Sequence, residues 1–178
     1  MSIIPPPESG MQFGPFQESR FIPWEKSNLR NACGDGFKCV EYICLDNNDD
    51  NCYQLIEAKK TAPNPAGPKG QEGLDEYINS IQNKFVDSTE MFFAHLLKFH
   101  TDQEKEIPSP FQVGTKEKAR LKYILVVKES RPDWLRPIKD ALTKALIRQR
   151  KVWNAKIAVL SADDAASEGL IQILEYSY

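Results

Sequence analysis

Three consecutive segments decide the fold: FKCVEYICL (37–45), DNNDDN (46–51) and CYQLIEA (52–58). The first and third segments are rich in β-branched and aromatic residues and carry apolar side chains at both odd and even positions. This pattern is typical of strands that are covered on both faces. The middle segment favours a turn, because Asn and Asp accept left-handed backbone conformations and bond their own backbone. The sequence therefore predicts an antiparallel β-hairpin over residues 37–59.

The register of this hairpin is expected to bring charged side chains together. If the turn is centred on Asp49, Glu41 lies directly opposite Glu57, with Cβ atoms roughly 5 Å apart on one face of the sheet. Lys59 is two residues beyond Glu57, so strand alternation puts it on that same face. Ionised groups are unfavourable in a covered sheet unless they are paired or bind a cation. We therefore expect Glu41, Glu57 and Lys59 to form the functional centre.

This arrangement suits metal-assisted hydrolysis of a phosphodiester. Two carboxylates, here Glu41 and Glu57, can hold Mg²⁺ or Mn²⁺ while leaving positions for waters and phosphate oxygens. Lys59 can orient the attacking water or stabilise the developing negative charge. The alternative is a solvated strand end, where Lys59 and Lys60 pair with Glu41 in surface salt bridges that contribute little.

The elements around the hairpin predict an α/β domain. Helices and further strands alternate along the chain, which favours a mixed central sheet with helices on both faces. For the longest helix, a break near Asp87 and Ser88 stays open. The helices are expected at residues 24–33, 71–100, 132–150 and 162–169, and the further strands at 121–127 and 155–160.

Two segments outside this pattern are rich in proline or polar residues. Residues 1–20 contain three consecutive prolines and are predicted to form an extended arm before a single domain at 21–178. Residues 101–115 are predicted to be an exposed excursion.

The composition of the chain limits which cellular environment and which partners can be expected. The chain has 178 residues, a formal net charge of −2 and 27% charged residues, which are ordinary values for one globular domain. A nucleic-acid partner would need a local basic patch or a metal, because no global cationic field is present. No apolar run approaches the length of a membrane span, and no secretion signal is recognised. We expect a cytoplasmic protein with no membrane partner.

The four cysteines, Cys33, Cys39, Cys44 and Cys52, lie in one short segment. Their spacing lacks the paired short knuckles of structural zinc sites, and three of them fall in predicted strands. The sequence therefore predicts reduced thiols without zinc.

The segments Glu41-Tyr42-Ile43 and Glu57-Ala58-Lys59 together resemble the PD-(D/E)xK nuclease superfamily. The resemblance is closest to the nuclease domains of type I restriction motor subunits, which carry an acidic residue on one strand and a Glu-Ala-Lys run on the next. It implies a restriction-endonuclease-like three-layer core and Mg²⁺-dependent nuclease activity. The stretch from Glu57 to Pro65 is also similar to that of some bacterial proteins.

The resemblance also implies roles for individual residues. Glu41 and Glu57 correspond to the metal ligands and Lys59 to the catalytic lysine, while Glu25 and Gln71 occupy positions where some members carry auxiliary residues. The first acidic residue is Glu rather than the usual Asp, and no Pro-Asp dipeptide precedes it. Two rivals for this position remain, Asp35 before the strand and Asp46 at the opposite strand parity.

Two functions remain open at this point. The first is a metal-dependent nuclease acting on DNA or RNA. The second is a catalytically inactive module that keeps the nuclease scaffold and binds protein partners, as an accessory domain in defence or as a homodimer. Binding of Mn²⁺ that is lost in Glu57→Ala would distinguish the two.

Overall fold

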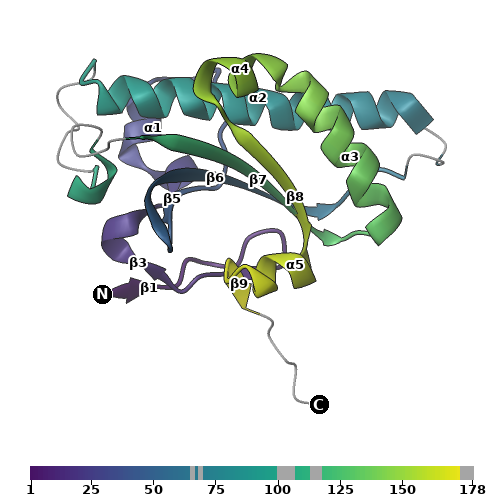
Figure 1. The fold of residues 1–178 in the computed structure, drawn as a ribbon, viewed down its shortest axis with the longest axis horizontal. Coiled ribbons are helices and arrows are strands. Elements are labelled where there is room, and N and C mark those ends of the chain that lie inside the picture. Colours follow the sequence, from purple (N-terminus) through teal and green to yellow (C-terminus); the bar gives the residue numbers. More distant parts are fainter. Residues whose placement is uncertain (65–66, 68–69, 100–106, 113–117, 173–178) are drawn as a thin grey trace.

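A five-stranded sheet in the order β4-β5-β6-β7-β8 forms the centre of the protein (Figure 1). The structure is a computed structural model and describes residues 1–64, 67, 70–99, 107–112 and 118–172. The strands are β4 (Phe21–Ile22), β5 (Tyr42–Asp46), β6 (Asp49–Thr61), β7 (Arg120–Glu129) and β8 (Lys156–Ser161).

The sheet is mixed, as predicted. Strands β4, β5 and β6 are antiparallel neighbours, whereas β6, β7 and β8 run parallel. Parallel neighbours need a crossover connection, which is usually helical. Helix α2 (Gly70–Leu96) lies between β6 and β7 in the chain, and helices α3 (Pro132–Ala145) and α4 (Ile147–Trp153) lie between β7 and β8. The α/β class is therefore confirmed.

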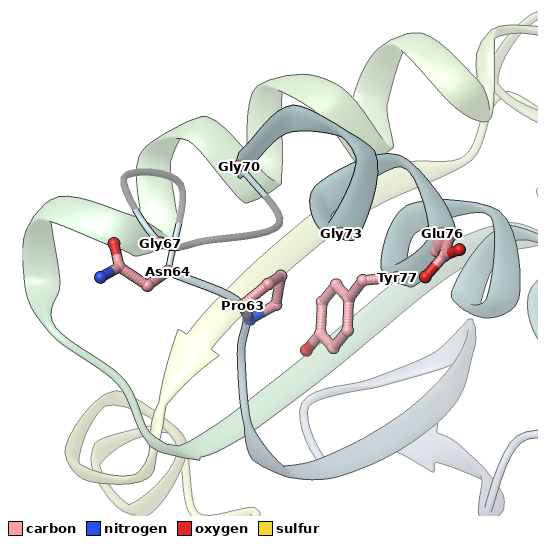
Figure 2. Close-up of a pocket in the computed structure, with 7 residues that line it drawn as sticks. All are labelled: Pro63, Asn64, Gly67, Gly70, Gly73, Glu76 and Tyr77. Atoms are coloured by element: carbon pink, nitrogen blue, oxygen red, sulfur yellow. The ribbon is translucent and has the colours of Figure 1, made fainter.

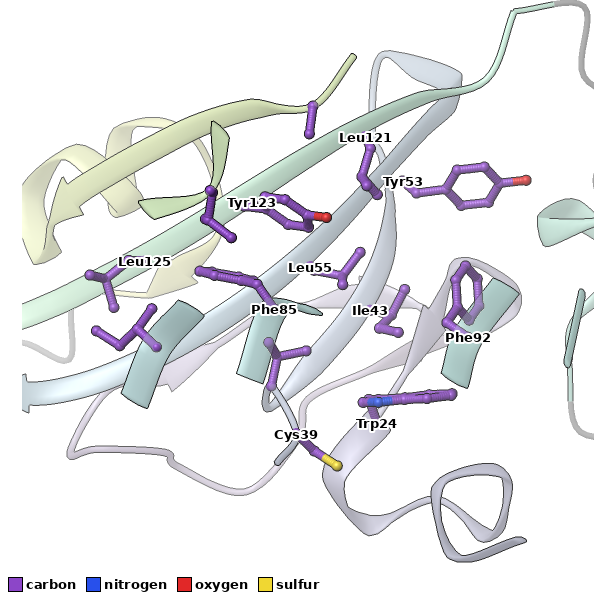
Figure 3. Packing of buried hydrophobic residues seen from close by; sticks show 14 of the residues in the cluster. Trp24, Cys39, Ile43, Tyr53, Leu55, Phe85, Phe92, Leu121, Tyr123 and Leu125 are labelled. Atoms are coloured by element: carbon purple, nitrogen blue, oxygen red, sulfur yellow. The ribbon is translucent and has the colours of Figure 1, made fainter. Parts of the chain in front are cut away.

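The two faces of the sheet are covered by different parts of the chain. Figure 1 shows α2, α3 and α4 over one face, with α5 (Ala162–Ser167) and the N-terminal strands against the other. Odd-numbered residues of β5 and β6, such as Ile43 and Leu55, pack in the same cluster as Phe85 of α2 (Figure 3). Even-numbered residues, such as Cys44 and Ile56, pack in the cluster on the other face.

The hairpin has the predicted register but a different turn. Tyr42 pairs with Ile56 and Ile43 with Leu55, as predicted, but the ladder ends at Tyr42 and does not include the predicted pair of Glu41 with Glu57. The predicted centre of the turn at Asp49 is wrong, because Asp46 already pairs with Asp49. A β-bulge between Leu45 and Asp46 shifts the register. The bulge takes up the extra residues of β6. The pairs from Leu45–Tyr53 to Tyr42–Ile56 therefore keep one alignment.

The first strand of the hairpin starts at Tyr42, and the predicted start at Phe37 is wrong. Side chains of α2 bind the backbone of this stretch instead. Lys38 N donates to Asp87 Oδ2 at 2.8 Å, and Val40 N donates to Ser88 Oγ at 2.9 Å. Backbone donors that are bound in this way do not take part in the sheet.

Helix α2 is continuous from Gly70 to Leu96, with no break at Asp87 or Ser88. The other two long helical predictions need correction. The predicted helix at 24–33 is a 3-10 turn (Trp24–Lys26) followed by α1 (Asn28–Ala32), which is capped by Ser27 Oγ. The predicted helix at 132–150 is divided at Leu146, whose backbone is not helical, into α3 and α4.

The N-terminal segment is part of the layered structure. It contributes β1 (Ser2–Ile3), β2 (Gln12–Phe13) and β3 (Phe16–Gln17), and β2 pairs with β9 (Ile171–Gln172). Phe13 is completely buried, with Met11 and Phe16 beside it in the second apolar cluster. The first 20 residues therefore complete the core on that face of the sheet.

The predicted excursion at 101–115 lies largely outside the described residues. Where it is described, the expected exposure is wrong. Ile107 and Phe111 are buried, and the carbonyl of Phe111 accepts a hydrogen bond from Tyr53 Oη at 2.7 Å. Ile107 and Phe111 therefore anchor residues 107–112 to the core.

The cysteines are all reduced thiols. Cys44 lies in β5 and Cys52 in β6, as predicted, but Cys39 precedes β5 and is not in a strand. The prediction that they bind no zinc stays a prediction. Within the described ranges, no helix is long and apolar enough to cross a membrane.

Candidate functional site

The carboxylate of Glu57 is the centre of the site. Its side chain is completely buried in β6 on the face that α2 covers, and two ammonium groups contact it. Lys84 Nζ, from α2, lies 2.9 Å from Oε1 and 3.0 Å from Oε2. Lys59 Nζ lies 2.7 Å from Oε1. Because little water screens these charges, they interact more strongly than a surface pair would.

Glu41 reaches the same ammonium from the neighbouring segment. Its backbone N–H donates to the carbonyl of Ile56 at 3.1 Å, so Glu41 is bound to the same residue of β6 that pairs with Tyr42. Its Oε1 lies 3.4 Å from Lys84 Nζ, and only 7% of the residue is exposed. Glu41 and Glu57 therefore share one cation, which is the amine of Lys84.

The structure brings Glu41, Glu57 and Lys59 together on one face, as the strand alternation predicts. The contacts differ from those of a solvated strand end. Lys59 pairs with the buried Glu57, while Lys60 points elsewhere and lies 3.9 Å from Glu129. The carboxylates are thus held inside the protein and not at its surface.

Burial changes the protonation of the cluster. The pKa of Glu41 is raised to about 8, first because burial disfavours its ionised form and second because Glu57 carries the same charge. Burial also raises the pKa of Glu57, although Lys84 and Lys59 oppose the rise. Burial alone would lower the pKa of Lys84, but the carboxylates of Glu57 and Glu41 raise it above its ordinary value. Burial and the charge of Glu57 therefore favour the protonated form of Glu41.

Glu25 lies at the rim of this cluster. It belongs to the 3-10 turn before α1 and is exposed. Its backbone N–H donates to the carbonyl of Glu41 at 3.4 Å, and its charge contributes to the raised pKa of Glu41. The predicted auxiliary residue is therefore next to the first carboxylate.

Three other candidates lie away from Glu57. Gln71 is exposed on the first turn of α2, where its amide donates to Asp75 Oδ1 at 2.7 Å. Asp35 is exposed in the bend that precedes β5. Asp46 lies at the tip of the hairpin, where its Oδ2 accepts from Gln54 Nε2 at 2.6 Å. Neither aspartate replaces Glu41, and Gln71 makes no contact with the cluster among the contacts the described residues form.

A hollow of about 520 Å³ lies beside the start of α2 (Figure 2). Figure 2 shows the ring of Tyr77 next to Pro63 at its wall. The hydroxyl of Tyr77 is buried and has no hydrogen-bond partner among the described residues. Burial raises its pKa, and the charge of Glu57 adds to this rise. Tyr77 therefore lies at the wall of this hollow, and the charge of Glu57 acts on its hydroxyl.

A second hollow, of about 360 Å³, reaches the cluster at Lys84 and Glu25. Arg30 and Lys38 add positive charge to its wall, and Phe37 adds an aromatic ring. The charged cluster is therefore accessible from the surface on this side.

The donor set fits a hard divalent cation. Mg²⁺ and Mn²⁺ are bound through one or two carboxylates and keep several waters. Glu41 and Glu57 already converge on one cation, the ammonium of Lys84. Within the described residues, no three His, Cys, Asp or Glu side chains form a group that could hold a metal. A metal would therefore be held by two carboxylates, with Lys84 displaced.

Known proteins add no residue roles to this picture. No protein-family model, curated protein or solved structure matches the chain. The functional interpretation therefore depends on the cluster itself.

Lys84 is the central residue that the sequence analysis does not identify. The apolar stripe of α2 includes Tyr77, Ile81 and Phe85, and Lys84 follows Ile81 by three positions. Residues three and four apart lie on the same face of a helix. A lysine within the apolar stripe of a helix that covers a strand with a buried Glu is the sequence signal that could have identified Lys84.

Proposed function

We propose that this protein is a nuclease of the PD-(D/E)xK type, which hydrolyses phosphodiester bonds with the help of Mg²⁺ or Mn²⁺. The observation that supports the proposal is the convergence of Glu41 and Glu57 on one cation beneath α2, with Lys59 at 2.7 Å from Glu57. The mixed sheet between two covering layers is compatible with a restriction-endonuclease-like core.

Each residue has a defined task in this proposal. Glu41 and Glu57 would hold the cation through their carboxylates, both in the ionised form. The bound ion supplies polarisation of the phosphoryl group and a more acidic water. Lys59 stabilises the negative charge that develops on the phosphate.

Lys84 holds the two carboxylates together before the cation binds. Two buried like charges repel each other, and its ammonium compensates them. If a divalent ion took this position, Lys84 would be displaced, and the hollow at Glu25 would receive it, because the negative charge of Glu25 already favours the ammonium form. Lys84 and the metal therefore compete for one place.

The position of Lys84 also favours a second function. If its ammonium replaces the cation permanently, the cluster is a structural ion pair and the protein is a non-catalytic module that binds protein partners. A buried pair of this kind specifies the arrangement of the core without chemistry.

Cleavage of labelled oligonucleotides tests the nuclease proposal. We expect the wild-type protein to cleave in Mn²⁺ and to be inhibited by EDTA, whereas Glu57→Gln and Lys59→Met are inactive. Glu129→Gln is the matched control, because it changes an exposed carboxylate on the neighbouring strand. No cleavage by the wild type, together with no Mn²⁺ binding in calorimetry, would support the interaction module instead. Cleavage by Glu57→Gln at the wild-type rate would contradict both the site and its chemistry.

A further inference from the structure

The hollow that reaches Lys84 combines an aromatic ring with positive charge. Phe37 is 43% exposed, which is unusual for a large apolar ring, and it lines the hollow next to Lys38. Arg30 lines the same wall from α1. Planar bases stack on exposed aromatic rings and phosphates bind guanidinium and ammonium groups, so this combination matches a nucleotide.

Hydrogen bonds hold the side chain of Arg30 in place without neutralising its positive charge. Its Nε donates to Cys39 Sγ at 3.3 Å, and its two terminal nitrogens donate to Asn31 Oδ1 and to the carbonyl of Phe37, each at 3.4 Å. These acceptors are neutral and the bonds are long. Among the described residues, no carboxylate forms an ion pair with Arg30. The guanidinium is therefore positioned for an anion that comes from outside.

The ring of Phe37 is positioned by the same contacts. Arg30 binds its carbonyl, and the next residue, Lys38, is bound through its N–H to Asp87 Oδ2 on α2 at 2.8 Å. Both contacts hold the single peptide group that joins Phe37 to Lys38, which attaches the backbone next to the ring to α1 and α2. A preorganised ring loses little conformational freedom when a base stacks on it.

The size and charge of the hollow favour a single strand over a duplex. Its volume of about 360 Å³ is at the lower end of the range for small-ligand sites, so that it suits one nucleotide. Duplex binding depends on many phosphate contacts over a broad basic surface. The chain has a net charge of −2, and only two further cations, Arg30 and Lys38, line this hollow beside Lys84.

We propose that this hollow binds one nucleotide of a single-stranded nucleic acid, with the base on Phe37 and a phosphate on Arg30 and Lys38. The inference rests on the proposed nuclease function, because it places the next phosphate of the strand toward Lys84 and the carboxylates. It assigns single-stranded ends or loops, of DNA or of RNA, as the substrate class.

Fluorescence anisotropy with labelled oligo(dT), oligo(U) and a short duplex, all in EDTA, tests the inference without cleavage. We expect both single strands to bind more tightly than the duplex. Phe37→Ala is expected to weaken this binding about tenfold, from the loss of one stacked base. Arg30→Gln is expected to reduce the salt dependence by about one phosphate contact. Phe99→Ala is the matched control, because Phe99 is 77% exposed elsewhere, and it is expected to bind as the wild type does.

The outcomes separate this inference from the nuclease proposal. Unchanged affinity in Phe37→Ala and Arg30→Gln, or tighter binding of the duplex, would overturn the inference even if Mn²⁺-dependent cleavage is intact. Weaker binding in both variants, with no change in Phe99→Ala, would support it even if no cleavage occurs. A preference for oligo(U) or oligo(dT) that Phe37→Ala removes would support it as well.

Discussion

Glu41 is the residue whose protonation most affects the site. Its pKa is about 8 in the folded protein, against an ordinary value of 4.5. The unfolded chain therefore loses this proton first as the pH rises, and folding stability falls between about pH 4.5 and about pH 8, and then levels off. The raised pKa of Glu57 acts in the same direction.

We predict that Glu41→Gln flattens this pH dependence. The variant is expected to be more stable than the wild type at pH 8 and to lose less stability between pH 5 and pH 8, because it has no carboxyl to ionise. Urea denaturation at a series of pH values measures the effect. Glu129→Gln, an exposed change, should keep the full dependence. Identical pH profiles for Glu41→Gln and the wild type would contradict the assignment.

Lys84→Met tests whether the ammonium of Lys84 compensates the buried carboxylates of Glu41 and Glu57. Removing the shared ammonium leaves Glu41 and Glu57 without their common partner, and we expect a loss of about 3 kcal/mol in the free energy of unfolding. Adding Glu57→Gln to this variant should recover a large part of the loss. Lys60→Met, which changes an exposed ammonium, serves as the control and should change stability little. The measurement is chemical denaturation.

The same variant separates the two proposed functions. If the carboxylates form a cation site, Mn²⁺ should stabilise Lys84→Met more than the wild type, because the competing ammonium is gone. If Mn²⁺ changes the stability of neither protein, the cluster is a structural ion pair.

At the residue scale, part of the site could be predicted. Strand alternation was sufficient for Glu57 and Lys59, and the hairpin register brought Glu41 close to them, although Glu41 itself lies just before β5. Lys84 could not be placed in this way, since its contact depends on how α2 packs on the sheet. Gln71 was expected nearby because the resemblance implies an auxiliary residue at that position, but its side chain binds Asp75 on the first turn of α2.

At the element scale, α2 both covers the sheet and organises the chain before β5. Ser88 Oγ accepts the N–H of Val40, and Ser88 is completely buried. This bond fixes the residue next to Glu41. The predicted start of this strand at Phe37 was wrong. The pattern of apolar residues does not show whether a backbone N–H bonds to a neighbouring strand or to side chains of a helix.

We predict that Ser88→Ala destabilises the protein by about 2 kcal/mol, because it leaves the buried N–H of Val40 without an acceptor. It should also weaken Mn²⁺ binding by displacing Glu41. Asn83→Ala, at an exposed position of the same helix, is the control and should leave stability unchanged or slightly higher. Thermal denaturation and calorimetry measure the two effects, and a neutral Ser88→Ala would contradict this role of α2.

At the scale of the whole molecule, the N-terminal segment is a structural layer. Its aromatic residues pack against the face of the sheet opposite to α2, where Phe13 lies 5.2 Å from Tyr42 between ring centroids. The class and mixed sheet could be predicted from alternating helices and strands. This layer could not, because prolines and glycines conceal the periodicity of short strands.

We predict that Phe13→Ala destabilises the protein by about 4 kcal/mol, as expected when a fully buried aromatic ring is removed from a core. Phe99→Ala, at an exposed ring, should change stability little. Denaturation followed by tryptophan fluorescence measures both. Equal stabilities of the two variants would show that residues 1–20 do not belong to the core.

Anomalous diffraction from a crystal soaked in Mn²⁺ tests the central claim most directly. We predict one strong peak between Glu41 and Glu57, with oxygens of both carboxylates roughly 2.0–2.6 Å from the ion and Lys84 displaced. A Glu57→Gln crystal soaked in the same way should lose this peak. The absence of a peak in the wild type, with Lys84 Nζ still between the two carboxylates, would contradict the account.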